Sequence, residues 1–158
     1  MAWPAVRYDV RVASEGDLGP VRSRLAGDDL VILRERLVDD ERGRLLRAVR
    51  GSETVGSVIV SWAPADEPEV RAVLPGVPLM YLLRVDRAHR CRGIGTGLIR
   101  RAEAYLRGRG HDRVLIGVDQ SNGRAARLYL SLGYRPVLNG ISGSDGAYDI
   151  LVRDLARQ

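Results

Sequence analysis

The stretch RCRGIGTG, at residues 90–97, is the most informative part of this 158-residue chain, and we call it the glycine loop. Three glycines alternate with other residues directly before an amphipathic helical run, and two arginines lie just upstream. Glycine lets the backbone approach a ligand closely, and a helix N-terminus presents N–H groups with a partial positive charge. The glycine loop therefore predicts a phosphate-binding site, with a plain surface loop as the alternative.

Two common phosphate-binding motifs do not fit the glycine loop. The Walker A motif needs a lysine after its last glycine, and all 25 basic residues of this chain are arginine. The dinucleotide fingerprint G-x-G-x-x-G fails because Leu98 stands where its third glycine is required. Neither a P-loop nucleotide hydrolase nor a Rossmann dinucleotide site is expected.

The composition predicts one soluble globular domain covering residues 1–158. Hydrophobic residues make up 45% of the chain and charged residues 28%, and no apolar run is long enough to span a membrane. The N-terminal residues lack the apolar region of a signal peptide. The single cysteine, Cys91, excludes an internal disulfide and fits a reducing cytoplasm.

The net charge of +5 suggests an anionic partner. Acidic residues are interspersed with the arginines, and the two tryptophans and six tyrosines form no stacking pattern for a single strand. A small polyanionic ligand is therefore expected rather than a nucleic acid, and solvated surface charge is the plain alternative.

Hydrophobic periodicity predicts an alternation of strands and helices. Strands are expected at residues 6–13, 45–49, 55–62, 79–85, 113–118, 134–138 and 147–155, and helices at 18–25, 30–38, 95–109 and 123–132. The turn at 50–53 joins two strands into a hairpin. Residues 63–78, which carry four prolines, and the glycine- and serine-rich residues 139–146 are expected to be loops.

One face of the helix predicted at 123–132 carries polar groups. Asn122, Ala125 and Tyr129 are three and four residues apart, so they share a helix face. An amide and a phenol separated by a small residue suit a ligand, although Tyr129 could equally be a tyrosine at the edge of the core. Gly133 is placed to end this helix.

These features together resemble the GNAT superfamily of acyl-CoA-dependent N-acyltransferases. Residues 90–95 match its R/Q-x-x-G-x-G/A signature, and residues 122–134 match its N-x-x-A-x-x-L-Y-x-x-x-G-F/Y pattern. Either motif alone is weak, whereas both in the correct order around a strand are specific. The resemblance implies an α/β fold with a mixed, mostly antiparallel sheet of about seven strands and about four helices, in which two central strands splay apart.

The resemblance also implies a site for acetyl-CoA, without a metal. Pantetheine would pair with the strand at Leu83, Arg84 and Val85, and the pyrophosphate would bind the backbone amides of the glycine loop. Asn122 would hydrogen-bond the pantetheine arm, and an arginine would pair with the phosphates. The cofactor-binding residues expected on this basis are Leu83, Arg84, Val85, Arg90, Cys91, Arg92, Gly93, Ile94, Gly95, Thr96, Gly97, Asn122, Ala125 and Arg127, with Arg124 as a further phosphate partner.

The resemblance assigns Tyr129 as the general acid that protonates the departing thiolate, because a phenol is protonated at neutral pH. No enzyme nucleophile is needed, and Cys91 has no recognisable base beside it. The general base is open. Many family members carry a carboxylate on the strand before the loop, whereas residues 79–85 contain none. A water chain, Tyr81, or one of the acids Glu69, Asp119 and Asp149 could take the proton, and each acid could equally be a surface charge.

The expected function is therefore acetyl transfer from acetyl-CoA to an amine. An acyl-CoA-binding sensor module without catalysis is the alternative, supported by the missing carboxylate. The acceptor would be shaped by residues 18–38, 63–78 and 139–146, whose acids could attract a cationic amine. Homodimers are common in such enzymes, so a homodimer is left open. The two histidines, His89 and His111, are expected to be solvated loop residues.

Overall fold

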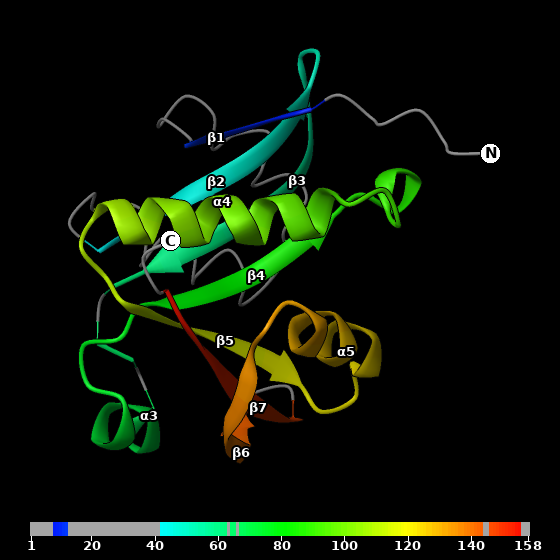
Figure 1. Ribbon diagram of the computed structural model, residues 1–158. Helices are drawn as coiled ribbons and strands as arrows, with labels where there is room; N and C mark the ends of the chain where they lie inside the picture. The colour runs from blue at the N-terminus through cyan, green and yellow to red at the C-terminus, as the bar shows by residue number, and fades with distance from the viewer. Residues whose placement is uncertain (1–7, 13–41, 63, 66, 144–145, 156–158) are drawn as a thin grey trace. The chain divides into compact units, whose positions relative to one another are not determined.

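The computed structural model describes residues 8–12, 42–62, 64–65, 67–143 and 146–155 (Figure 1). The chain divides into two compact units. The first consists of the residues up to Ser61 together with Leu82–Ala102, and the second of Trp62–Tyr81 together with the chain from Glu103 onward. Strand β4 (Leu79–Val85) and helix α4 (Ile94–Gly108) contribute residues to both units. Among the described helices, none has the length and hydropathy needed to cross a membrane.

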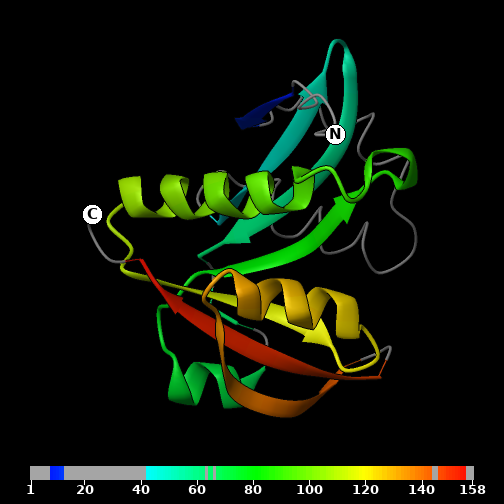
Figure 2. The same cartoon turned by 45° about the vertical axis from the view of Figure 1, so that its right-hand side comes forward.

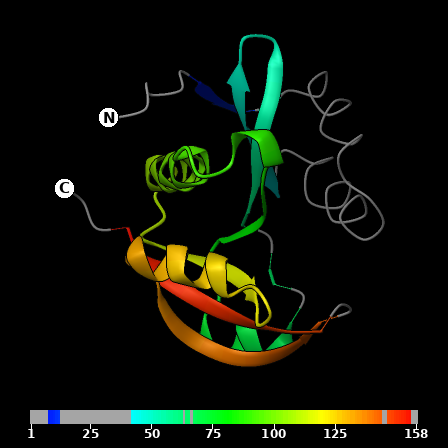
Figure 3. The ribbon, with the colours of Figure 1, turned by 90° about the vertical axis from the view of Figure 1, so that its right-hand side faces the viewer.

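The first unit is built on an antiparallel hairpin. Strands β2 (Gly43–Arg50) and β3 (Glu53–Ser61) pair antiparallel, β1 (Asp9–Val12) adds to β2, and β4 adds to β3. The predicted turn is confirmed: Gly51 adopts a φ of +63° between the two long strands, which are prominent in Figure 3. Every residue of β3 after Glu53 is buried, so both faces of this strand are covered.

Helix α4 packs closely on β3 because Gly56 has no side chain. A Cβ at position 56 would come within 2.9 Å of the Arg84 carbonyl oxygen, 3.1 Å of Leu98 Cδ1 and 3.3 Å of Ile94 Cγ2. Ile94 and Leu98 are fully buried and lie on successive turns of α4. The bare backbone at Gly56 therefore sets how near the first turns of α4 come to the sheet.

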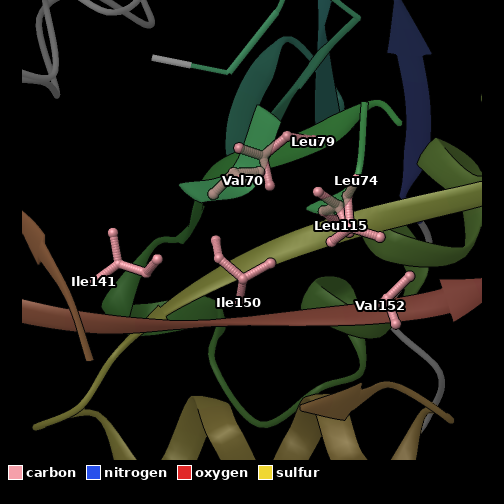
Figure 4. Close-up of a cluster of buried hydrophobic side chains, with 7 residues drawn as sticks. All are labelled: Val70, Leu74, Leu79, Leu115, Ile141, Ile150 and Val152. Atoms are coloured by element: carbon pink, nitrogen blue, oxygen red, sulfur yellow. The ribbon is translucent and has the colours of Figure 1, made fainter. Parts of the chain in front are cut away.

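The second unit is a sheet with a helix on each face. Strand β4 begins parallel to β5 (Arg113–Asp119), with Leu79 opposite Leu115, and β7 (Gly146–Asp154) lies between β5 and β6 (Arg135–Gly143) in antiparallel pairing. Helices α3 (Pro68–Val73) and α5 (Gly123–Ser131) cover opposite faces of this sheet (Figure 2). The α3 side holds a buried cluster, drawn in Figure 4, that consists of Val70, Leu74, Leu79, Leu115, Ile141, Ile150 and Val152.

The expected fold class is confirmed, with two local corrections. Residues 139–143 are not part of a loop, because β6 continues to Gly143 and absorbs the extra residues in two register shifts. Residues 63–78 are not wholly a loop either, because α3 begins at Pro68, whose fixed φ suits the first position of a helix. The predicted helices at 18–25 and 30–38 lie outside the described residues, as does most of the predicted first strand beyond Asp9–Val12.

Replacing Gly56 should destabilise the protein. We expect Gly56→Ala to lower the free energy of unfolding by about 1–3 kcal/mol, because the new methyl group overpacks the contact between α4 and β3. Chemical denaturation monitored by circular dichroism measures this change. Gly108→Ala is the matched control, because a Cβ there meets no atom within 4 Å and alanine favours the helix. An equal loss of stability in both variants would contradict the packing argument.

Candidate functional site

The glycine loop turns the chain from β4 into α4 through two residues in the left-handed region. Cys91 has a φ of +62° and Gly93 a φ of +81°. The entry to the turn is fixed by two hydrogen bonds: Asp86 N donates to the Val55 carbonyl at 2.9 Å, and Arg90 Nε donates to the Val85 carbonyl at 3.1 Å. A short 3-10 helix, η2 (Arg87–His89), lies between these two anchors.

The backbone amides at the start of α4 are arranged as an anion site. The hydrogen bond that closes the first turn runs from Gly97 N to the Gly93 carbonyl at 2.9 Å. The amides of residues 94–96 therefore have no acceptor within the helix. A Cβ at Gly95 would make only ordinary contact with Val85 and Leu83, at 3.7 and 3.8 Å. Packing within the first unit thus leaves room for a side chain at position 95, which fits the interpretation that a ligand requires the glycine.

The charges around this helix end also favour an anion. Residues 87–102 contain five arginines and no acidic residue. Arg90, Cys91, Arg92 and Gly93 are exposed, whereas Ile94 is buried beneath them. Exposed guanidinium groups and a helix N-terminus reinforce each other toward phosphate. Arg84 on β4 is exposed, and its Nη1 donates to the carbonyl of Leu83 at 3.3 Å.

The second half of the predicted site lies on α5, in the second unit. Asn122 is the N-cap of this helix, and its side-chain oxygen accepts the Ala125 N–H at 3.1 Å. Capping uses the oxygen of the amide, so the NH₂ group is directed elsewhere and is suited to a ligand carbonyl. Ala125 is half-buried, and Arg124 and Arg127 are exposed. These residues and the glycine loop belong to different units.

Tyr129 is fixed by the end of α5. Gly133 has a φ of +98°, Gly133 N donates to the Leu130 carbonyl at 3.1 Å, and Tyr134 N donates to the Tyr129 carbonyl at 3.1 Å. This pair of bonds is a Schellman motif, which confirms Gly133 as the residue that ends the helix. The motif brings the rings of Tyr129 and Tyr134 to a centroid separation of 6.3 Å, tilted by 58°. Tyr129 is 5% exposed, so its ring position is set by packing.

A buried carboxylate holds the second tyrosine in place. The hydroxyl of Tyr134 donates to Glu103 Oε2 at 2.7 Å, and Arg153 Nη1 lies 3.0 Å from Glu103 Oε1. Glu103 is fully buried on α4, and the pairing with arginine and phenol satisfies its charge. A chain of contacts thus runs from Tyr129 through Tyr134 and Glu103 to Arg153.

Three carboxylates, those of Glu69, Asp119 and Asp149, are candidates for the general base, and they lie in different surroundings. Asp119 accepts hydrogen bonds from Ser121 Oγ at 2.6 Å and from Ser121 N at 2.8 Å, and these bonds lower the pKa of its carboxyl group. A lowered pKa makes Asp119 a weaker base. Asp149 is half-buried and accepts from Gln120 Nε2 at 2.8 Å and from Gly140 N at 2.9 Å. Glu69 is exposed in the first turn of α3.

The two histidines lie in different surroundings. His111 follows α4, where burial, and then the nearby Arg109, lower the pKa of its imidazole. His111 is half-buried in the loop between α4 and β5, where a loop residue was expected. His89 is half-buried in η2. Within the described part of the chain, no three His, Cys, Asp or Glu side chains gather closely enough to hold a metal ion.

Sequence reasoning missed three residues that contact or support the predicted site residues of the two units. Tyr8, just before β1, donates a hydrogen bond to the Gly93 carbonyl at 3.2 Å. Glu103 and Arg153 support Tyr134 from within the second unit. Glu103 could have been noticed in the sequence, because it is an acidic residue among apolar residues of α4. Nothing local marked Tyr8, because its contact is with residues distant in sequence.

Comparison with known sequences identifies one family. The model of the "Acetyltransferase (GNAT) family" matches residues 9–134. A mycothiol acetyltransferase of Salinispora arenicola is 34% identical over 116 residues, which are 73% of this chain and 36% of that protein. A mycothiol acetyltransferase of Thermobispora bispora is 44% identical over 55 residues, 35% of this chain and 19% of that protein. The matched part of this chain spans 36% and 19% of the length of these two relatives.

Solved structures share the fold at low sequence identity. The ribosomal-protein-S18-alanine N-acetyltransferase of Escherichia coli matches with a TM-score of 0.71 at 16% identity, over 96% of each chain. Arabidopsis thaliana NAA60 in complex with acetyl-CoA matches with a TM-score of 0.72 at 20% identity, over 94% of this chain and 98% of that one. At these identities the likeness concerns the fold alone.

Relieving the left-handed backbone at Cys91 should stabilise the protein. We expect Cys91→Gly to raise the free energy of unfolding by roughly 0.5–1 kcal/mol, because a side chain at a φ of +62° is unfavourable and glycine is not. Thermal unfolding measures the gain. Cys91→Ala is the control, since it removes the thiol and keeps the Cβ; a similar gain in that variant would assign the effect to the sulfur.

The carboxyl of Asp119 should titrate below its ordinary range. Since its pKa is lowered in the folded protein, the stabilisation that it provides is present above the ordinary carboxyl pKa and is lost as pH falls through the lowered value. NMR titration of the side-chain carboxyl measures this pKa, and Ser121→Ala should raise it by removing the hydroxyl bond. An unchanged pKa in that variant would contradict the role of Ser121.

Proposed function

This chain belongs to the GNAT family of acetyltransferases, and on that premise we propose that it transfers the acetyl group of acetyl-CoA to an amine. The observation that carries the proposal is the glycine loop. Two residues in the left-handed region lead the chain into α4, where the amides of residues 94–96 have no acceptor within the helix. The residues around this helix end include arginines, and residues 87–102 contain no acid. A pyrophosphate is the anion that this family places at such a loop, which supports acetyl-CoA as the donor substrate.

The residues of each half have separate roles in the proposed reaction. The backbone of Leu83–Val85 pairs with the pantetheine arm, the glycine loop binds the pyrophosphate, and Asn122 donates its side-chain NH₂ group to a pantetheine carbonyl. The neutral amine attacks the thioester carbonyl carbon directly. A backbone amide near Leu83 stabilises the oxyanion, and the C–S bond then breaks to release the thiolate of coenzyme A.

Tyr129 is proposed as the acid that protonates this thiolate. Its ring is buried and is held by the Schellman motif and by Tyr134, so that little rotational freedom remains. Tyr134 is held in turn by Glu103, which accepts a hydrogen bond from the Tyr134 hydroxyl and pairs with Arg153. A phenol whose position is set by packing suits proton transfer to one defined atom.

The acceptor ammonium must lose its proton to a group other than a carboxylate of β4, since residues 79–85 contain none. Among the three acids, Asp149 fits best as a base or a relay, because it is half-buried, whereas Glu69 is exposed and the pKa of Asp119 is lowered. The absence of an acid on β4 also favours a second candidate function, an acyl-CoA-binding module without transferase activity.

Replacing the proposed acid should slow the reaction without weakening donor binding. We expect Tyr129→Phe to lower kcat by about 100-fold and to leave the Kd of acetyl-CoA within a factor of two, because the ring packing is retained and only the hydroxyl is lost. Release of free coenzyme A thiol measures kcat, and calorimetry measures Kd. Tyr105→Phe is the control, since it also removes one tyrosine hydroxyl, and the ring of Tyr105 stacks on Trp62. Full activity of Tyr129→Phe would exclude it as the acid.

A panel of amines separates the two functions. The names of the relatives and structural neighbours suggest two acceptor classes to include: a mycothiol-type amine and a peptide with an N-terminal alanine. Thiol release with any member supports the transferase. Tight binding of acetyl-CoA in calorimetry, without release across the panel, would favour the binding module.

A further inference from the structure

Tyr8 makes two contacts with the start of α4. Its hydroxyl donates to the carbonyl oxygen of Gly93 at 3.2 Å. The same hydroxyl occupies the space beside Gly97 that a side chain would need: a Cβ at position 97 would overlap the Tyr8 oxygen and come within 3.0 Å of its Cζ. Tyr8, Gly93 and Gly97 all belong to the first unit.

The hydrogen bond from Tyr8 adds a second restraint to the peptide group that follows Gly93. Gly93 has a φ of +81°, and no side chain restrains its rotation. Its carbonyl accepts from both Gly97 N and the Tyr8 hydroxyl. In a trans peptide group the carbonyl and the following N–H point in opposite directions, so holding the Gly93 oxygen fixes the direction of the Ile94 N–H. That N–H is the first of the amides that have no helical acceptor.

The choice of glycine at position 97 supports this interpretation. Glycine within a helix is unfavourable because it leaves more freedom in the unfolded chain. Residue 97 lies inside α4, and there the absence of a side chain makes room for Tyr8. Glycine, which is unfavourable for helix formation, thus stands at the position where Tyr8 contacts the helix.

We propose that Tyr8 is a positioning residue of the phosphate-binding loop, which holds the Ile94 amide toward the pyrophosphate of acetyl-CoA. The inference rests on the proposed function for the identity of the anion. Because the restraint acts before the ligand arrives, its loss weakens binding by requiring the loop to be ordered on binding.

The first test removes only the hydroxyl. We expect Tyr8→Phe to raise the Kd of coenzyme A about five-fold, the amount that one hydrogen bond contributes, and to leave kcat at saturating acetyl-CoA unchanged. Calorimetry with the whole chain measures Kd. NMR titration with inorganic pyrophosphate should show a weaker response of the Ile94 amide in the same variant. Tyr105→Phe, which should leave both readouts unchanged, is the matched control.

A double-mutant cycle tests the contact at Gly97. Gly97→Ala alone should displace Tyr8 and weaken coenzyme A binding at least as much as Tyr8→Phe does. In a Tyr8→Ala background the same change should cause no further loss, and the double variant should melt higher than Tyr8→Ala because alanine favours the helix. Additive losses would mean that Gly97 is needed by the ligand alone and would overturn the proposed contact.

The outcomes separate this inference from the proposed function. If the wild-type protein binds neither coenzyme A nor pyrophosphate, the proposed function fails and the inference fails with it. If the wild type binds both and Tyr8→Phe binds them equally well, the function stands and the positioning role of Tyr8 is wrong. If binding by Tyr8→Phe falls only in proportion to a general loss of folded protein, seen as a lowered Tm, the role of Tyr8 is structural and the inference is overturned.

Discussion

The close packing of α4 against β3 is the constraint on which the first unit depends. Gly56 supplies a bare stretch of backbone, and Ile94 and Leu98 fill the space above it. These two residues lie in the first turns of α4, so the same contact that builds the core also places the helix end that the glycine loop enters. Stability and the position of the anion site therefore arise from one packing contact.

In the second unit, polar contacts hold Tyr134 in place against Tyr129. A phenol that donates a proton must be held by groups that do not themselves react with it. The Schellman turn at Gly133 brings Tyr134 against Tyr129, and the carboxylate of Glu103 holds the far end of Tyr134. Arg153 pairs with that carboxylate, and this ion pair stabilises the buried charge.

Much of the fold followed from local sequence, and the exceptions have physical causes. The bounds of β4 were predicted correctly, because the residues between Pro78 and Asp86 are apolar except for Arg84. The strand β6 was cut short because Asn139 and Gly140 resemble a loop, whereas in the structure a register shift accommodates them and Gly140 takes a φ of +67°. In the candidate site, the motif residues of the glycine loop and α5 were visible in sequence. Tyr8 was not, since its contact with Gly93 depends on packing between distant segments.

The space that Tyr8 fills beside Gly97 has an evolutionary consequence. Two positions far apart in the chain share one small volume, so neither can change freely while the other stays as it is. In relatives that keep a bulky residue at position 8, glycine should persist at position 97; where position 8 is small, alanine becomes the better helix residue there. The residues at positions 8 and 97 should therefore covary. The pair found in a given relative would indicate whether its glycine loop is held by this contact or by another one.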